Sequence, residues 1–311
     1  MSADADSYDF IIVGSGFGGS VSALRLSEKG YRVLVIEKGR RFGRKDFPTT
    51  NWNVFGYQWL PWLGMRGPFK MNFFQHITAL TGVGVGGGSL IYANTLPVPK
   101  EEFYTTGNWA GLADWQQELS PHYETATKML GAVPNPEMTY TDEIIADLAK
   151  DLGREEHFHP TNVAVFFGEP EVEVPDPYFG GDGPDRVGCT KCGGCLVGCR
   201  VGAKNTLDLN YLYLAQQLGA EVIAETEVMA IRHREGRYVL ETRSSFGWVK
   251  ETKTFSADRV VLAGGVMGTI PLLLRMRLDP DGLPRLSDKV GRYVRTNNEA
   301  IMGVPTSRRD V

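Results

Sequence analysis

The sequence predicts an α/β fold, namely a Rossmann-like domain with a parallel sheet that is discontinuous in sequence, together with an inserted, partial substrate-binding region. Three observations lead to this expectation. A strand, a glycine-rich turn, a helix and a second strand follow one another near the N-terminus. A second strand–glycine–helix pattern lies in the last third of the chain. The 311 residues, 42% of them hydrophobic, exceed one ordinary domain.

The N-terminal pattern is carried by "YDFIIVGSGFGGSVSALRLSEKGYRVLVIEKG". Gly14, Gly16 and Gly19 fit the G-x-G-x-x-G spacing between an apolar strand and a helix, and Gly18 lies in the same turn. Gly14 permits the turn, Gly16 lets a pyrophosphate approach the backbone, and Gly19 packs helix on strand. Glu37 follows the second strand, where a carboxylate binds a ribose 2′-hydroxyl and argues against NADP. We therefore predict a dinucleotide site at these five residues.

A second glycine cluster, "GVGVGGGSLIYAN" at 82–94, has five glycines within seven positions. Main chain that lacks side chains can approach a flat cofactor ring and donate N–H groups to it. A glycine-rich surface loop is the alternative interpretation. We expect the cluster to face the same cofactor as the N-terminal turn.

The last third contains "DRVVLAGGVMGTIPLLLRM", which is typical of a strand, a glycine turn and a helix. We expect residues 260–263 to add a parallel strand to the N-terminal sheet, with Gly264 and Gly265 beside the cofactor. A nicotinamide dehydrogenase completes its site with consecutive βαβ repeats, whereas here the sheet resumes only after a long intervening stretch. This organisation favours FAD over NAD.

These stretches, with "GAKNTLDLNYLYLAQQLGAEV" (202–222) and "LPRLSDKVGRYV" (283–294), resemble the glucose–methanol–choline (GMC) family of FAD-dependent alcohol oxidoreductases, most of all its bacterial cholesterol oxidases. The resemblance implies an enzyme in which hydride passes from the hydroxyl of a sterol or another hydrophobic alcohol to FAD. The resemblance also implies that the glycine cluster contacts flavin and that Val228 contacts adenine. The family has an asparagine at the position of Tyr92, and we expect Asn94 to take its place. The cofactor-binding residues implied in this way are Gly86, Gly87, Gly88, Ser89, Asn94, Val228, Gly264 and Gly265.

The family's catalytic histidine and its partner lie near the C-terminus of longer chains, beyond residue 311, and none of the five histidines here matches that motif. We therefore expect a truncated or split enzyme and assign no catalytic residue. The expected domains are a first FAD-binding segment at 1–100, an inserted region with a Cys-rich loop at 101–200 and a second FAD-binding segment at 201–311. Alternatives are a non-catalytic flavin or iron–sulfur module that needs a partner chain and, last, an NAD-dependent dehydrogenase.

All four cysteines lie in "CTKCGGCLVGCRVGAKN", where Cys189, Cys192, Cys195 and Cys199 have the ferredoxin spacing C-x2-C-x2-C-x3-C. We interpret them as ligands of a [4Fe–4S] or [3Fe–4S] cluster. Structural zinc usually takes two separated C-x2-C pairs, and Arg200 stands where ferredoxins have proline. Reduced structural thiols or a redox dithiol are the alternatives. The cholesterol oxidases of the family lack this run, so a dehydrogenase with an acceptor other than oxygen is a further hypothesis.

The segment "NWNVFGYQWLPWLGMRGPFKMNFF" gathers Trp52, Trp59 and Trp62 among several phenylalanines. This density suits a bulky apolar substrate such as a sterol, and ordinary core packing explains it equally well. The net charge of −4, with mixed basic and acidic residues, argues against a nucleic-acid partner. The N-terminus has no signal-peptide pattern and no apolar run reaches the length of a membrane span, so we expect a cytoplasmic protein.

Overall fold

The structure is a computed structural model that describes residues 7–50 and 52–295. The chain divides into two compact units. Unit 1 comprises the described residues up to Asn94 and those from Phe166 to Val294, and unit 2 comprises Thr95–Val165 with Arg295. These boundaries differ from the expected domains, because the Cys-rich loop belongs to unit 1 and not to the insertion.

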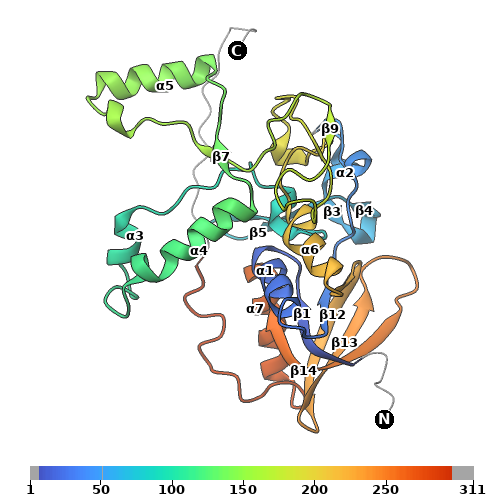
Figure 1. Ribbon diagram of the computed structural model, residues 1–311. Helices are drawn as coiled ribbons and strands as arrows, with labels where there is room; N and C mark the ends of the chain where they lie inside the picture. Colours follow the sequence, from blue (N-terminus) through green and yellow to red (C-terminus); the bar gives the residue numbers. More distant parts are fainter. Residues whose placement is uncertain (1–6, 51, 296–311) are drawn as a thin grey trace. The chain divides into compact units, whose positions relative to one another are not determined.

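Unit 1 is built on a six-stranded mixed sheet with the order β11-β2-β1-β14-β13-β12 (Figure 1). Four neighbouring strands run parallel, and β13 and β12 continue the sheet in an antiparallel arrangement. The strands are β1 (Ser7–Val13), β2 (Val33–Ile36), β11 (Glu221–Ile223), β12 (Thr226–Arg234), β13 (Arg237–Ser244) and β14 (Thr252–Leu262). The predicted α/β fold with a sequence-discontinuous parallel sheet is confirmed.

The strand predicted at 260–263 joins the N-terminal sheet in parallel, with Ile11 opposite Val260 and Val13 opposite Leu262. β2 is buried along its whole length: it lies between β11 and β1, and α1 packs against it. Its apolar sequence VLVI suits that position.

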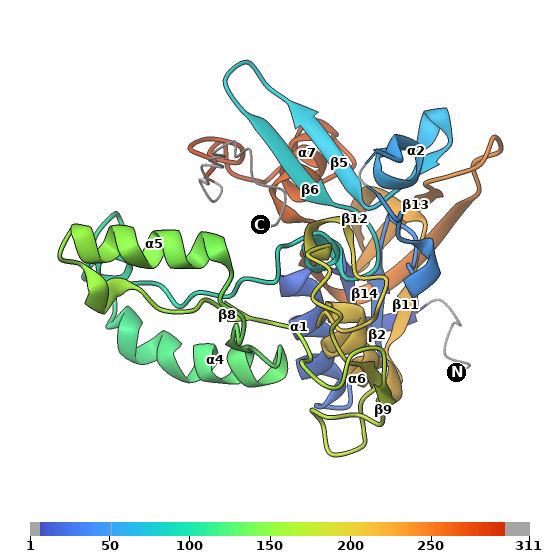
Figure 2. The ribbon, with the colours of Figure 1, turned by 90° about the horizontal axis from the view of Figure 1, so that it is seen from above.

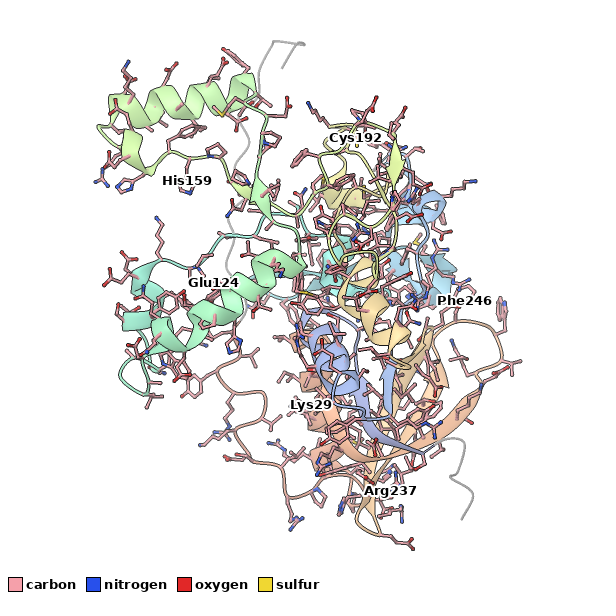
Figure 3. All side chains as sticks on the ribbon, in the orientation of Figure 1. Lys29, Glu124, His159, Cys192, Arg237 and Phe246 are labelled. Carbon is pink, nitrogen blue, oxygen red and sulfur yellow. The ribbon has the colours of Figure 1, made fainter. Side chains whose placement is uncertain are left out.

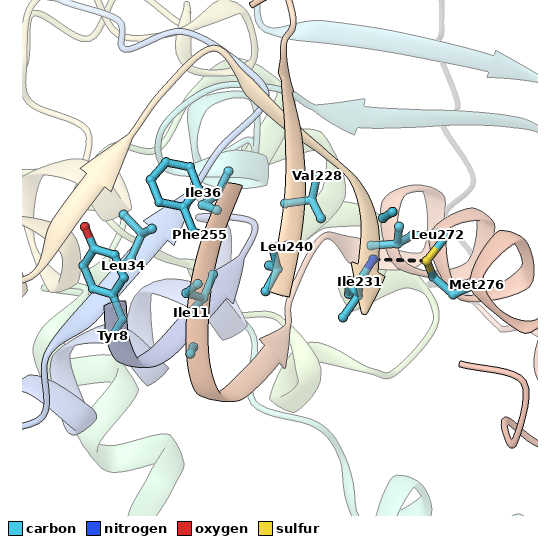
Figure 4. Packing of buried hydrophobic residues seen from close by; sticks show 12 residues of the cluster. Tyr8, Ile11, Leu34, Ile36, Val228, Ile231, Leu240, Phe255, Leu272 and Met276 are labelled. Atoms are coloured by element: carbon cyan, nitrogen blue, oxygen red, sulfur yellow. Dashed lines mark hydrogen bonds between the residues drawn. The ribbon is translucent and has the colours of Figure 1, made fainter. Parts of the chain in front are cut away.

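Helices α1 (Phe17–Ser27) and α6 (Tyr211–Gln217) pack against each other, while α7 (Gly265–Leu278) follows β14 and packs on β12. The main core contains Leu272 and Met276 of α7 together with side chains from five strands (Figure 4). In this core the Ile231 N–H donates to Met276 Sδ at 3.1 Å. Because α7 begins at the glycine turn after β14 and packs on β12, it connects this turn to the antiparallel part of the sheet.

The segment between β2 and the glycine cluster forms small elements: α2 (Val54–Tyr57) and the pairs β3 (Trp59–Leu60) with β4 (Met65–Arg66) and β5 (Phe69–Phe73) with β6 (Thr78–Gly82). The β5–β6 hairpin projects as a two-stranded ribbon (Figure 2). Another small pair, β9 (Glu173–Val174) with β10 (Arg186–Val187), precedes the Cys-rich loop.

Unit 2 contains α3 (Glu101–Thr105), α4 (Trp115–Met129), α5 (Tyr140–Asp151) and the pair β7 (Val133–Pro134) with β8 (Asn162–Val163). α5 begins with a capping box in which Thr139 N–H and Oγ1–H both donate to Asp142. In the described part of the chain, no helix has the length and apolar character needed to span a bilayer.

Candidate cofactor site

Two glycine turns of unit 1 meet at the carboxyl ends of the adjacent strands β1 and β14. Gly14 has φ +99°, and a Cβ at this position would lie 2.5 Å from the Ala263 carbonyl oxygen. A Cβ at Gly19 would lie 2.0 Å from the Gly14 carbonyl oxygen. As the sequence predicts, Gly14 makes a tight turn and Gly19 brings helix α1 against it.

The second glycine cluster packs against the first. Gly87 has φ +55°, and a Cβ there would lie 2.6 Å from Gly16 Cα. A Cβ at Gly82 would meet the Gly87 carbonyl oxygen at 2.5 Å. Contact between main chains therefore accounts for part of the glycine content of 82–88, at Gly82 and Gly87. The sequence analysis attributed it to a flat cofactor ring alone, and that contact stays a prediction.

The Glu37 carboxylate is buried at the end of β2 and held by the first glycine turn. Its Oε2 accepts from Ser15 N–H at 3.1 Å and from Ser15 Oγ–H at 2.7 Å, and its Oε1 accepts from Gly39 N–H at 2.8 Å. Gly86 N–H in turn donates to Ser15 Oγ at 3.1 Å. Ser15 thus links Glu37, the residue predicted to bind a ribose, to both glycine clusters. The sequence analysis missed Ser15, because a serine inside G-x-G-x-x-G is an unrestricted position.

Helices α1 and α7 both begin at this place. Their N-cap residues, Gly16 and Gly264, provide no side-chain hydrogen bond to the first N–H groups. The positive end of a helix with free N–H groups attracts an anion. A Cβ on Gly16 would have its nearest neighbour at 4.0 Å, and one on Gly265 would meet nothing within 4 Å. The backbone is therefore accessible here, and the site fits the pyrophosphate of a dinucleotide.

The other predicted residues make the following contacts. Ser89 Oγ–H donates to the Gly86 carbonyl at 2.8 Å, and its oxygen accepts from Leu207 N–H at 3.0 Å. Asn94, with φ +55°, is buried and donates from Nδ2 to Cys195 Sγ at 3.3 Å. Val228 is buried in β12 next to an irregularity in strand register. Gly88 has only the Phe17 ring near its Cβ position.

The four cysteines lie on one loop of unit 1, with Cys192 exposed on it (Figure 3). Cys189 Sγ accepts from Lys191 N–H and Cys199 Sγ from Gly202 N–H, both at 3.3 Å. Burial raises the pKa of the Cys189 and Cys195 thiols, which favours their protonated forms. Over residues 7–50 and 52–295, no three His, Cys, Asp or Glu side chains form a group that could hold a metal ion. The iron–sulfur cluster therefore gains no support from this geometry.

A buried cation lies between the Cys-rich loop and the glycine cluster. Lys204 is only 1% exposed, and its Nζ donates to the Leu90 carbonyl at 3.1 Å and to the Cys195 carbonyl at 2.8 Å. Burial lowers the pKa of Lys204 to about 8. The sequence analysis quoted the segment around Lys204 only for its resemblance. A lysine between apolar and small residues in "VGAKNTL" was the available signal.

Comparison with known proteins supports this site. Residues 12–53 match the NAD(P)-binding Rossmann-like domain, and residues 183–287 match the GMC oxidoreductase family. The fold and site therefore define a nucleotide-binding domain of the Rossmann-like class.

Individual relatives are similar to nearly the whole of this chain. It is 48% identical over 306 residues to a cholesterol oxidase of Mycobacterium tuberculosis, with 96% of this chain and 53% of the relative covered. It is 45% identical to a cholesterol oxidase of Acinetobacter baumannii, with 98% and 56% covered. The structure of Aspergillus oryzae formate oxidase shares the fold, with a TM-score of 0.51 at 16% identity and coverage of 88% and 48%. The chain belongs to the GMC oxidoreductase family, and it spans about half the length of these curated relatives.

A matched pair of substitutions tests the packing of the first glycine turn. Gly19→Ala should lower the free energy of unfolding by about 1–3 kcal/mol, because its Cβ would overlap the Gly14 carbonyl oxygen. Gly18→Ala, one residue earlier in α1 and with nothing within 4 Å of its Cβ position, should leave stability unchanged or slightly raised. Urea unfolding followed by circular dichroism measures both. Equal stabilities of the two variants would contradict the packing described here.

Proposed function

We propose that this chain is the FAD-binding part of an alcohol oxidoreductase that removes hydride from the hydroxyl of a sterol or another hydrophobic alcohol. The observation that carries the proposal is the convergence of two uncapped helix starts, two glycine turns and the oriented Glu37 carboxylate. Membership of the GMC family implies FAD as the dinucleotide. The identity to cholesterol oxidases supports a sterol as substrate.

Each part of the site has a role in this proposal. The N–H groups that begin α1 would bind the pyrophosphate, and Glu37 would accept from a ribose hydroxyl. The main chain at 86–89 and Asn94 would contact the flavin, Val228 would contact the adenine, and Gly264 and Gly265 would contact the cofactor from the end of β14. Bound FAD would supply the hydride acceptor. We assign no catalytic base among the described residues.

The substitution Gly16→Ala tests FAD binding separately from folding. Its Cβ has 4.0 Å to the nearest protein atom and φ at Gly16 is −70°, so the free protein should keep its stability. The same methyl group would obstruct a pyrophosphate at the helix start, and the dissociation constant for FAD should rise at least about tenfold, the effect of about 1.4 kcal/mol. Titration with FAD followed by flavin fluorescence measures it. An unchanged affinity for FAD would mean that the pyrophosphate does not bind at Gly16.

The aromatic segment divides into core and surface. Trp59 is 6% exposed, whereas Trp52 and Trp62 are 88% and 77% exposed. Phe55 and Phe73 are also largely exposed. An apolar surface of this kind supports a hydrophobic ligand. Core packing therefore accounts for Trp59, and a ligand-binding role is proposed only for Trp52 and Trp62.

Two tryptophan variants distinguish these roles. Trp59→Ala should lower the free energy of unfolding by about 3–5 kcal/mol, since it empties a buried position. Trp62→Ala should change stability little and weaken binding of cholesterol, while FAD affinity stays the same. Thermal unfolding and quenching of tryptophan fluorescence by a sterol measure the two effects. Sterol binding that survives Trp62→Ala would argue against a role of this surface in substrate binding.

A second candidate function is a flavin module that acts only with a partner chain. The β5–β6 hairpin has Met71, Phe73 and Leu80 on one face, all exposed, and an isolated two-stranded hairpin is only marginally stable in water. Anaerobic addition of cholesterol to the FAD-loaded chain separates the candidates. Loss of the oxidised flavin spectrum favours the first, and a persistent spectrum favours the second.

We propose an iron–sulfur cluster from the cysteine spacing alone. Protein purified without oxygen should then contain iron and acid-labile sulfide in stoichiometric amounts, and Cys192→Ser should reduce both. Protein that binds FAD but contains neither would leave the cysteines as structural or redox thiols. An acceptor other than oxygen and a cytoplasmic location likewise remain proposals.

A further inference from the structure

We infer that Lys204 is a positioning residue of the cofactor site. Its side chain fixes the glycine turn at 86–90 by clamping it to the Cys-rich loop through hydrogen bonds. The inference deepens the proposed function and rests on it, since it names what fixes the main chain expected along FAD.

The clamp consists of two hydrogen bonds from one ammonium group. Lys204 Nζ donates to the carbonyl of Leu90, the last residue of the 3-10 turn Gly87–Leu90, and to the carbonyl of Cys195, which begins another such turn at Cys195–Val197. The ammonium also lies 4.6 Å from the centre of the Tyr92 ring. A single side chain thus joins two loops that are about a hundred residues apart in sequence.

Neighbouring contacts place the whole segment of Lys204 along the turn. Leu207 N–H donates to Ser89 Oγ at 3.0 Å, and Tyr92 Oη–H donates to the Asn205 carbonyl at 2.7 Å. On its other side the turn touches the start of α1, because Gly87 leaves no room for a Cβ against Gly16. Movement of this turn would therefore change the surface on which the dinucleotide would lie.

The chemistry of the clamp favours a positioning role over simple packing. Desolvation of an ammonium is costly, and a side chain of similar size without charge, such as methionine, would fill the same volume. The groups that interact electrostatically with Lys204 are the thiols of Cys195 and Cys199, the carboxyl of Asp208 and the Tyr92 ring. Its hydrogen bonds go to main-chain carbonyls of the two loops, so they act directly on the backbone of each loop.

Arg186 provides a matched control. It is also 1% exposed and cationic, and its Nη2 donates at 2.9 Å to the carbonyl of Leu209, which is not a residue of the turn at 86–90. If loss of any buried cation weakens FAD binding, the affinity should fall in both Lys204→Met and Arg186→Met. If Lys204 positions the turn, the affinity should fall mainly in Lys204→Met.

The test has two readouts. Hydrogen exchange of the free protein should show faster exchange at 87–92 in Lys204→Met than in the wild type, with little change there in Arg186→Met. The dissociation constant for FAD should rise about tenfold or more in Lys204→Met and change less than about threefold in Arg186→Met. Lys204→Gln, which keeps an N–H donor, should restore affinity in part and serves in place of the methionine variant if that variant does not fold.

Wild-type exchange at 87–92 in Lys204→Met or Lys204→Gln, or equal losses of FAD affinity in the Lys204 and Arg186 variants, would overturn the inference and leave the proposed function intact. Failure of the folded wild-type chain to bind FAD would instead overturn the proposed function, and the exchange experiment would still decide whether the clamp exists.

Discussion

The cofactor site depends on the contact of two main chains. Gly16 at the start of α1 and Gly87 in the second glycine cluster approach so closely that a Cβ on Gly87 would lie 2.6 Å from Gly16 Cα. Similar contacts join Gly14 to the end of β14 and Gly19 to Gly14. Together they bring the ends of two neighbouring parallel strands, two helix starts and a distant loop to one place. A side chain at Gly14, Gly19 or Gly87 would separate the parts.

Polar groups complete what the glycines allow. Ser15 holds Glu37 on one side and Gly86 on the other, so the carboxylate keeps one orientation in a buried place. The free N–H groups at the starts of α1 and α7 add positive potential beside it. On the other side of the glycine turn, the ammonium of Lys204 donates to the backbone carbonyls of Leu90 and Cys195, the second of which also accepts from Gly198 N–H. The site is thus defined by backbone groups that a few side chains orient.

The sequence was sufficient for features determined by local pattern. The β1–α1–β2 unit follows from apolar periodicity, glycine spacing and the position of Glu37, and the strand before Gly264 follows from the same kind of signal. The resemblance extended this to the GMC family, which the comparisons confirm. Which residues belong to the core was harder to predict: Trp59 is buried and Trp62 is exposed although they lie three positions apart in one aromatic segment.

Contacts between distant segments were not predictable from pattern. Ser15 and Lys204 have roles only because loops far apart in sequence meet, and a single sequence carries no record of that meeting. The Cys-rich loop likewise belongs to unit 1, since residues from Phe166 onwards return to it. Its regular cysteine spacing indicated a cluster, yet the described side chains are not arranged as a metal-ligand group. Spacing restricts which ligands can converge and does not fix where their sulfur atoms lie.

The most direct test of the account is an equilibrium titration of the folded, flavin-free chain with FAD and, in parallel, with NAD⁺. The account predicts saturable binding of one FAD per chain, with a change in the flavin spectrum, and no comparable binding of NAD⁺. A chain that is folded by circular dichroism and binds neither, or that binds NAD⁺ in preference, would contradict the claim that these glycine turns form an FAD site.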